Sequence, residues 1–108
     1  MTLEEVQARR DQVWEVVRKQ GVDRLKVAVA EPDNPLPYDY DAYFEVGFTP
    51  EAKAAWRGEQ AIGYVNAISD MAEELSDLLG CRAWVGDLDG VAKIRPSGEE
   101  LKARATPL

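Results

Sequence analysis

The sequence contains no histidine and only one cysteine, Cys81. The lack of histidine excludes Ser-His-Asp and Cys-His catalysis and every histidine-ligated metal site. A single cysteine forms neither an internal disulfide nor the paired cysteines of a zinc finger or an iron–sulfur cluster. We interpret Cys81, which follows Gly80, as a small apolar side chain and not as a nucleophile, because no histidine can activate it.

Positive charge and long apolar runs are also scarce. The chain has 13 Lys and Arg against 20 Asp and Glu, a formal net charge of −7. Such a charge disfavours direct binding to nucleic acid or anionic lipid, which needs clustered Lys and Arg. The longest apolar run is about as short as residues 27–30, against the ~20 residues of a bilayer span, and no signal peptide is found. We therefore expect a cytoplasmic protein without membrane association.

What is present indicates one globular domain over residues 1–108, with 45% apolar and 31% charged residues. Capping and periodicity predict helices at about 3–20, at 50 to about 56, along the amphipathic segment 62–79, and at about 98–105. Apolar, β-branched and aromatic runs predict strands at 25–30, at 81–85, and from a start between Tyr38 and Ala42 to Phe48. A proline-rich loop is expected at 31–37 and a turn at 87–90. The fold class expected is α+β, with a small mixed sheet of about three strands flanked by helices.

Two carboxylates are the strongest candidates for chemistry. Asp39 and Asp41 are two residues apart, so in a strand they would point to the same side. Two neighbouring carboxylates suit Mg²⁺, which prefers oxygen ligands and substrate phosphates. The alternative is a solvated entrance to the strand, since an Asp-rich chain contains such pairs by chance, and Asp87 and Asp89 form another.

Four segments in order give the chain a resemblance to the minimal nucleotidyltransferase (MNT) family, the small partners of HEPN-domain proteins in toxin–antitoxin modules. They are Arg9-Arg10 with Gly21-Val22-Asp23-Arg24-Leu25-Lys26-Val27, then Tyr38-Asp39-Tyr40-Asp41-Ala42-Tyr43-Phe44-Glu45, then Glu73-Glu74-Leu75-Ser76-Asp77-Leu78-Leu79-Gly80, and finally Ala105-Thr106-Pro107-Leu108. The resemblance implies a two-layer nucleotidyltransferase-like fold. It also implies a phosphate-binding Gly-Ser after the first strand and Mg²⁺ held by Asp39, Asp41 and a third carboxylate on the last strand.

Two of these three features are missing. Val29 and Ala30 stand at the Gly-Ser position, where the β-branched Val29 blocks close approach to a phosphate and Ala30 has no hydroxyl. The proline loop replaces the following helix and its N-terminal anion site. Our alignment places Trp84 where the third carboxylate belongs. These changes count against nucleotide binding and leave Mg²⁺ as an open question.

The main hypothesis is therefore a pseudoenzyme. It would be a degenerate nucleotidyltransferase-fold protein with little or no transferase activity that binds a HEPN-type protein as an antitoxin-like module. One alternative is an active Mg²⁺-dependent enzyme that moves AMP from ATP to a partner protein, with Glu31, Asp33 or Glu45 as the missing carboxylate. Another is a structural or oligomerising domain. The sequence leaves open whether a homo-oligomer forms.

Overall fold

A four-stranded sheet forms the centre of the molecule. The computed structural model describes residues 1–36, 39–55, 61–87 and 103–108. Within them the strands lie in the order β3-β2-β1-β4. β1 (Val22–Val29) is antiparallel to both β2 (Ala42–Phe48) and β4 (Thr106–Pro107), while β3 (Ala83–Asp87) is parallel to β2. The predicted α+β class with a small mixed sheet is confirmed, with one strand more than expected.

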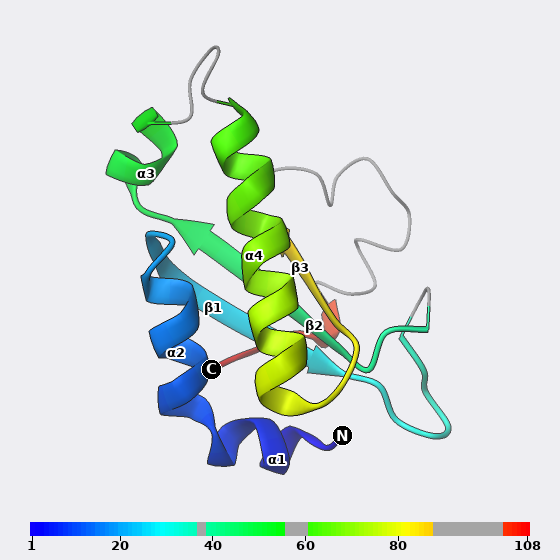
Figure 1. Ribbon diagram of the computed structural model, residues 1–108. Coiled ribbons are helices and arrows are strands. Elements are labelled where there is room, and N and C mark those ends of the chain that lie inside the picture. The colour runs from blue at the N-terminus through cyan, green and yellow to red at the C-terminus, as the bar shows by residue number, and fades with distance from the viewer. Residues whose placement is uncertain (37–38, 56–60, 88–102) are drawn as a thin grey trace.

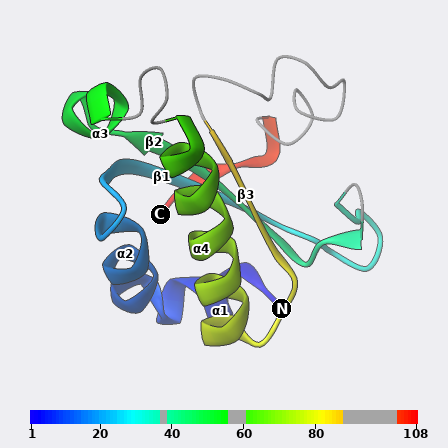
Figure 2. The same cartoon turned by 45° about the horizontal axis from the view of Figure 1, so that its top comes forward.

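Three helices cover one face of this sheet. α2 (Arg10–Arg18) and α4 (Ala61–Leu79) lie side by side over β1 and β2, and α1 (Leu3–Ala8) passes below the end of α4 (Figures 1 and 2). The short α3 (Pro50–Ala55) directly follows β2. The chain passes from β2 to its parallel neighbour β3 through α3 and α4. Two parallel strands need such a long crossover connection, because a tight turn cannot join them.

The main core lies between these helices and the sheet. It contains fully buried side chains from α2, α4 and β2, among them Val13, Val17, Met71, Leu75 and Phe44. The opposite face of the sheet carries a second cluster of buried residues, formed by Ala28, Leu36 and Tyr43, against which Trp84 packs. β2 is consequently buried along its whole length, on both faces.

The first predicted helix, 3–20, is wrong as a single element. Thr2 caps α1 as expected, its Oγ1 accepting a hydrogen bond from the Glu5 N–H at 3.2 Å. The chain then leaves helical geometry at Arg9, which has φ −110° and ψ 20°. The Arg9 guanidinium donates to the Leu78 carbonyl at the end of α4. Residues on both sides of this break keep an apolar face of helical period, so the periodicity alone did not reveal it.

β1 begins three residues before the strand predicted at 25–30. Val22 and Leu25 are both buried in the core although they are three residues apart, which strict alternation does not allow. The register with β2 shifts between Val22 and Arg24, so Asp23 is an extra, bulged residue. The bulge restores the alternation and leaves Arg24 on the sheet face that the helices do not cover.

Several expected boundaries are confirmed and others move. α3 and α4 match their predicted ranges, and Gly21 and Gly80 end helical segments with φ of 82° and 64°. β3 starts two residues later than the predicted 81–85 and includes Asp87, which was expected in a turn. Residues 103–104 are helical, but β4 follows at Thr106 where we expected no strand. Trp56, the rest of the 87–90 turn and residues 98–102 lie outside the described part.

Candidate functional site

The site expected from the sequence lies at one end of the sheet, where β1 ends and β2 and β3 begin. Backbone hydrogen bonds join the three segments there. The Ala30 N–H donates to the Asp41 carbonyl at 2.9 Å, and the Asp41 N–H donates to the Arg82 carbonyl at 2.9 Å. Ala30, Asp41 and Arg82 are therefore neighbours, although the sequence separates them widely. We refer to this region as the β1 exit.

The two aspartates of the predicted metal pair differ in conformation. Asp41 is exposed, and its Oδ2 accepts a hydrogen bond from the Arg82 N–H at 2.8 Å. Asp39 has φ 60°, a left-handed conformation that Asp tolerates better than most residues. β2 begins at Ala42, within the predicted range for its start, so both aspartates precede the strand and the alternation of a strand does not apply to them.

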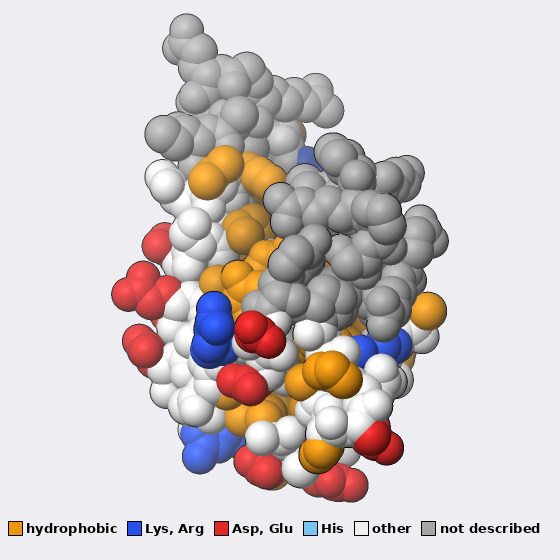
Figure 3. Space-filling model, turned by 90° about the vertical axis from the view of Figure 1, so that its right-hand side faces the viewer, with side chains coloured by type: hydrophobic (Ala, Val, Ile, Leu, Met, Phe, Trp, Pro, Cys, Tyr) orange, Lys and Arg blue, Asp and Glu red, His pale blue; other side chains and the backbone are white. Residues whose placement is uncertain are grey.

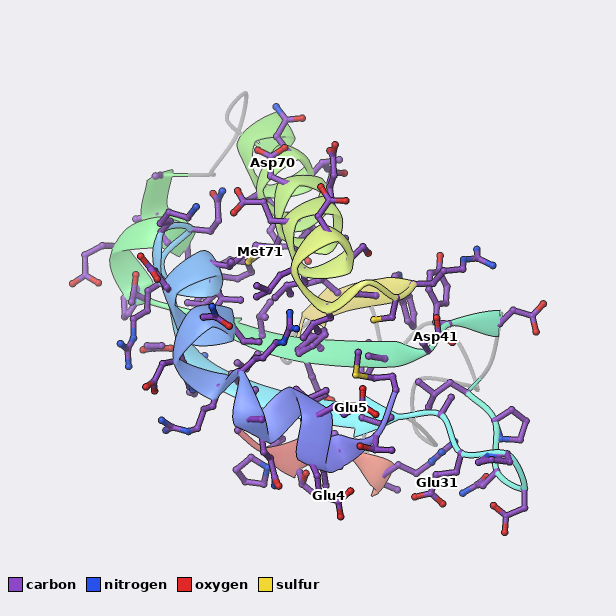
Figure 4. The ribbon with its side chains drawn as sticks, turned by 60° about the horizontal axis from the view of Figure 1, so that its bottom comes forward. Glu4, Glu5, Glu31, Asp41, Asp70 and Met71 are labelled. Carbon is purple, nitrogen blue, oxygen red and sulfur yellow. The ribbon has the colours of Figure 1, made fainter. Side chains whose placement is uncertain are left out.

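The residues considered as a third carboxylate do not gather around Asp41. Glu31 and Asp33 are exposed on the loop after β1, and in Figure 4 the Glu31 side chain does not point toward Asp41. Glu45 is only 1% exposed, but four residues of β2 place it roughly 13 Å along the strand from Asp41. Within the described ranges, no group of three His, Cys, Asp or Glu side chains is placed to hold a metal ion. The three-carboxylate site implied by the resemblance is thus not assembled among the described residues, and Mg²⁺ binding by Asp39 and Asp41 stays a prediction.

Aromatic and cationic side chains lie beside Asp41 instead. Trp84 is paired in register with Tyr43, and their ring centroids are 5.0 Å apart. Tyr40, between the two aspartates, stacks on Trp84 at 5.7 Å with an interplanar angle of 17°. The Arg82 guanidinium lies 5.3 Å from the Tyr40 ring centroid, within cation–π range. Tyr40, Arg82 and Trp84, which we call the aromatic patch, occupy the position where our alignment expected a carboxylate.

At the expected phosphate-binding position, the backbone N–H groups are hydrogen-bonded within the chain. The Ala30 N–H is bonded to Asp41, and the Glu31 N–H donates to the Asn34 carbonyl at 3.2 Å. A phosphate cradle needs such N–H groups to point at the ligand. The carbonyls of this loop also have a partner. Arg104 donates to the carbonyls of Val29, Asn34 and Pro35, at 3.3, 2.7 and 3.1 Å.

Sequence reasoning missed Arg104 entirely. It reaches the loop over a separation of 70 residues, and no motif in the chain links the two. Sequence reasoning also gave no role to Arg82, whose backbone and side chain both shape the β1 exit. A signal for Arg82 did exist, because the predicted α4-to-β3 connection at Gly80 brings the following residues to the end of the sheet.

Cys81 adjoins the β1 exit as well. It is half-buried, and burial raises the pKa of its thiol above the usual range. The negative charge of Asp41 raises this pKa further, while the N-terminal ammonium group lowers it. The thiol form is thus favoured at neutral pH, in keeping with our interpretation of Cys81 as an unactivated side chain.

Comparisons with known proteins add no family to this description: no protein-family model, curated protein or solved structure matches the chain. Among the helices that the structure describes, none has both the length and the apolar character needed to cross a membrane. The functional argument therefore rests on the residues of the β1 exit and on the resemblance noted in the sequence.

Proposed function

We propose that this chain is a degenerate nucleotidyltransferase-fold protein that acts by binding another protein, with little or no transferase activity. One observation carries the proposal. The groups that would have to bind a Mg²⁺–nucleotide complex already have partners inside the chain: the Ala30 N–H is bonded to the Asp41 carbonyl, and the Asp41 carboxylate accepts from the Arg82 N–H. A phosphate would have to compete for the Ala30 N–H, and one of the two Asp41 carboxylate oxygens is already hydrogen-bonded.

The energetic argument points in the same direction. Transferase chemistry depends on preorganised electrostatic groups, and removing one of them costs about 10²–10³ in rate. At the β1 exit the phosphate donors are engaged and Trp84 replaces a ligand to the metal, although such losses are not simply additive. A site changed in this way loses the groups that catalysis needs but keeps its surface shape. Binding a protein surface needs only the shape and the exposed side chains.

The aromatic patch supplies side chains suited to such binding. Tyr, Trp and Arg are the residue types that carry most of the binding energy in protein interfaces. Tyr40 and Trp84 are half-buried and Arg82 is exposed, so the patch is packed in place but accessible. Figure 3 views the molecule from the side of β3, and hydrophobic side chains reach the surface there between acidic and basic ones.

The partner that we expect is a HEPN-type protein, with this chain in the antitoxin-like role. The resemblance in the sequence supports this choice, and so does the net charge of −7, because an acidic protein attracts a basic, RNA-cutting partner electrostatically. Long-range attraction of this kind raises the association rate, whereas the aromatic patch would determine how long the complex lasts.

The direct test is co-purification with a small helical protein encoded by a neighbouring gene. We expect a stable complex with the wild-type chain, and Arg82→Ala or Tyr40→Ala to weaken it about tenfold or more. Val65→Ala is the matched control, since Val65 is 57% exposed on α4 and lies outside the patch. Equal binding by all three variants would remove the patch from the proposal. A monomer that binds no such protein would favour the structural-domain alternative.

A second test separates the proposal from an active enzyme. In an amide NMR titration with Mg²⁺ and then Mg²⁺–ATP, we expect no saturable shifts around residues 29–45 at millimolar ligand. The double variant Asp39→Asn/Asp41→Asn is the comparison. Saturable shifts that this variant abolishes would overturn the proposal and favour nucleotidyl transfer.

A further inference from the structure

Residues 104–108, which we call the strap, run along the outer edge of β1. β4 is the paired part of the strap, with Pro107 opposite Lys26 and Thr106 opposite Val27. It lies beside β1 on the side away from β2 (Figure 4). β4 has two residues and β1 has eight, so the pairing of β4 alone spans only a small part of this edge.

The strap donates to three successive carbonyls on this edge. Carbonyls two residues apart in a strand point to the same side, so those of Leu25, Val27 and Val29 all face the strap. The Leu108 N–H donates to the Leu25 carbonyl at 3.1 Å. The Thr106 hydroxyl donates to the Val27 carbonyl at 3.5 Å. The third carbonyl extends this row beyond the two residues of β4.

The donor to this third carbonyl is a side chain. The Arg104 guanidinium donates to the Val29 carbonyl at 3.3 Å and so replaces the N–H of a further strand residue. The same guanidinium donates to the carbonyls of Asn34 and Pro35, at 2.7 and 3.1 Å. These belong to the loop after β1, which two backbone bonds between Glu31 and Asn34 close on itself. One planar group therefore fastens both the strap and the loop to β1.

Further contacts connect the strap with the loop and with α2. Ala105 packs against the second cluster of buried residues, to which Leu36 of the loop belongs. At the far end of the strap, Arg10 of α2 donates from Nε to the backbone oxygen of Leu108. Lifting the strap would withdraw Arg104 from the loop carbonyls in the same movement, so we expect the strap and the loop to open as one unit.

The strap is well suited to opening. Thr106 and Pro107 are both exposed, and proline has no N–H to donate to β1. Segments with few buried contacts open at a low free energy, well below that of global unfolding. Once the strap is lifted, the carbonyls that it satisfied are available along the edge of β1. A strand edge of this kind is a template for pairing with another strand.

The strand that fits this edge is β1 of a second copy. Two identical strands that pair antiparallel about a two-fold axis are self-complementary, because each offers the other the same row of N–H and C=O groups. The side chains suit this pairing as well. Asp23 and Arg24 are neighbours of opposite charge, so two antiparallel copies of β1 can place opposite charges across from each other.

We propose that the strap is a latch: it opens together with the loop after β1, and the uncovered edge of β1 then pairs with β1 of a second copy of this chain. The closed latch prevents association through this edge, and Arg104 is the residue that joins the strap to the loop. This inference goes beyond the proposed function, because partner binding at the aromatic patch does not require the latch to open.

Amide hydrogen exchange of the full chain, followed by NMR, tests whether the strap and the loop open together. Arg104→Ala removes charge-assisted bonds from the loop end and should speed exchange about tenfold at Leu108, four residues away. Arg10→Ala acts on the opposite end of the strap and should speed exchange at Glu31 and Asn34 in the loop.

Two references accompany these variants. Arg18→Ala removes the same charge from α2, where Arg18 lies over the Trp14 ring, and should leave exchange in the strap and the loop within about twofold of wild type. Exchange at Phe44, which is fully buried, should not change in any variant, since it requires a larger opening. If Arg104→Ala and Arg10→Ala each speed exchange only beside the substituted residue, the strap and the loop open separately and the latch is wrong.

Sedimentation velocity over a range of protein concentrations tests the pairing. Both copies must open before they pair, so a tenfold rise in the open population should raise the dimerisation constant of Arg104→Ala about a hundredfold. Arg18→Ala should match wild type. In a mixture of labelled and unlabelled Arg104→Ala, we expect nuclear Overhauser effects between the β1 strands of two copies. A variant whose strap opens but that stays monomeric at millimolar protein, or that dimerises through other residues, would overturn the pairing.

Discussion

The two ends of β1 differ in how their polar groups are satisfied. At the β1 exit, the N–H groups of Ala30 and Arg82 and the carboxylate of Asp41 are hydrogen-bonded to one another's segments. At the other end, charged side chains of both signs, from Arg10, Asp23, Arg24 and Lys26, line a cavity of about 540 Å³. The residue types of the sequence draw attention to the first end. The comparison indicates that residue types alone do not reveal how the polar groups of a candidate site are engaged after folding.

Two glycines of the sheet, Gly86 in β3 and Gly47 in β2, offer the sharpest contrast. A Cβ on Gly86 would lie 2.5 Å from the Tyr43 hydroxyl and 2.9 Å from its ring, which is buried and cannot move away. We expect Gly86→Ala to lower the free energy of unfolding by about 2 kcal/mol through overpacking. Urea denaturation would measure this change.

Gly47→Ala is the matched variant. Its Cβ would lie 2.6 Å from the Arg24 guanidinium, which is the far end of a flexible side chain and can swing aside. We expect a stability change under about 0.5 kcal/mol. Equal stability losses in Gly86→Ala and Gly47→Ala would contradict the rigid packing that we assign to Tyr43.

The two aspartates of the β1 exit should respond differently to truncation. Asp41→Ala removes the acceptor of the Arg82 N–H, which we expect to cost about 1 kcal/mol because water replaces part of the bond at this exposed position. Asp39→Gly should stay within about 0.5 kcal/mol of wild type, since glycine adopts the left-handed backbone without strain. Thermal unfolding checks both values. A larger loss in Asp39→Gly than in Asp41→Ala would reverse the roles that we assign.

The smallest expected effect concerns the reactivity of Cys81. Its raised pKa reduces the thiolate fraction at any pH below that pKa, so alkylation by iodoacetamide should be slow in the native protein. Asp41→Asn removes one cause of the raised pKa while the amide oxygen can still accept from Arg82. We therefore expect the alkylation–pH curve to move to lower pH. Asp39→Asn is the control, and equal curves for the two variants would exclude an influence of Asp41.

Much of the fold was predictable because local chemistry determines it. Thr2 and Thr49 cap helices as their spacing predicts, with the Thr49 Oγ1 accepting from the Ala52 N–H at 3.2 Å. The break at Arg9 and the bulge at Asp23 were missed, since both depend on contacts with distant parts of the chain. β4 was missed for the same reason: two residues form a strand only because β1 offers an edge.

The candidate site was predictable in position but not in geometry. Asp41 and Arg82 do lie together at the end of the sheet, joined by backbone hydrogen bonds, although neither the left-handed Asp39 nor the Arg104 contacts could be inferred.

The burial of β2 on both faces limits which substitutions this strand can accept. Ala42–Phe48 has no exposed position: residues such as Phe44 are buried under the helices, and Tyr43 is buried in the second cluster on the opposite face. Most substitutions there meet a packed neighbour, with Gly47 beside the Arg24 side chain as the exception, whereas β1 has positions that face solvent. In distant homologues we expect these seven positions to be the slowest to diverge, even where every catalytic residue has been replaced. Relatives of this chain are therefore better sought by the pattern of β2 than by the aspartates that precede it.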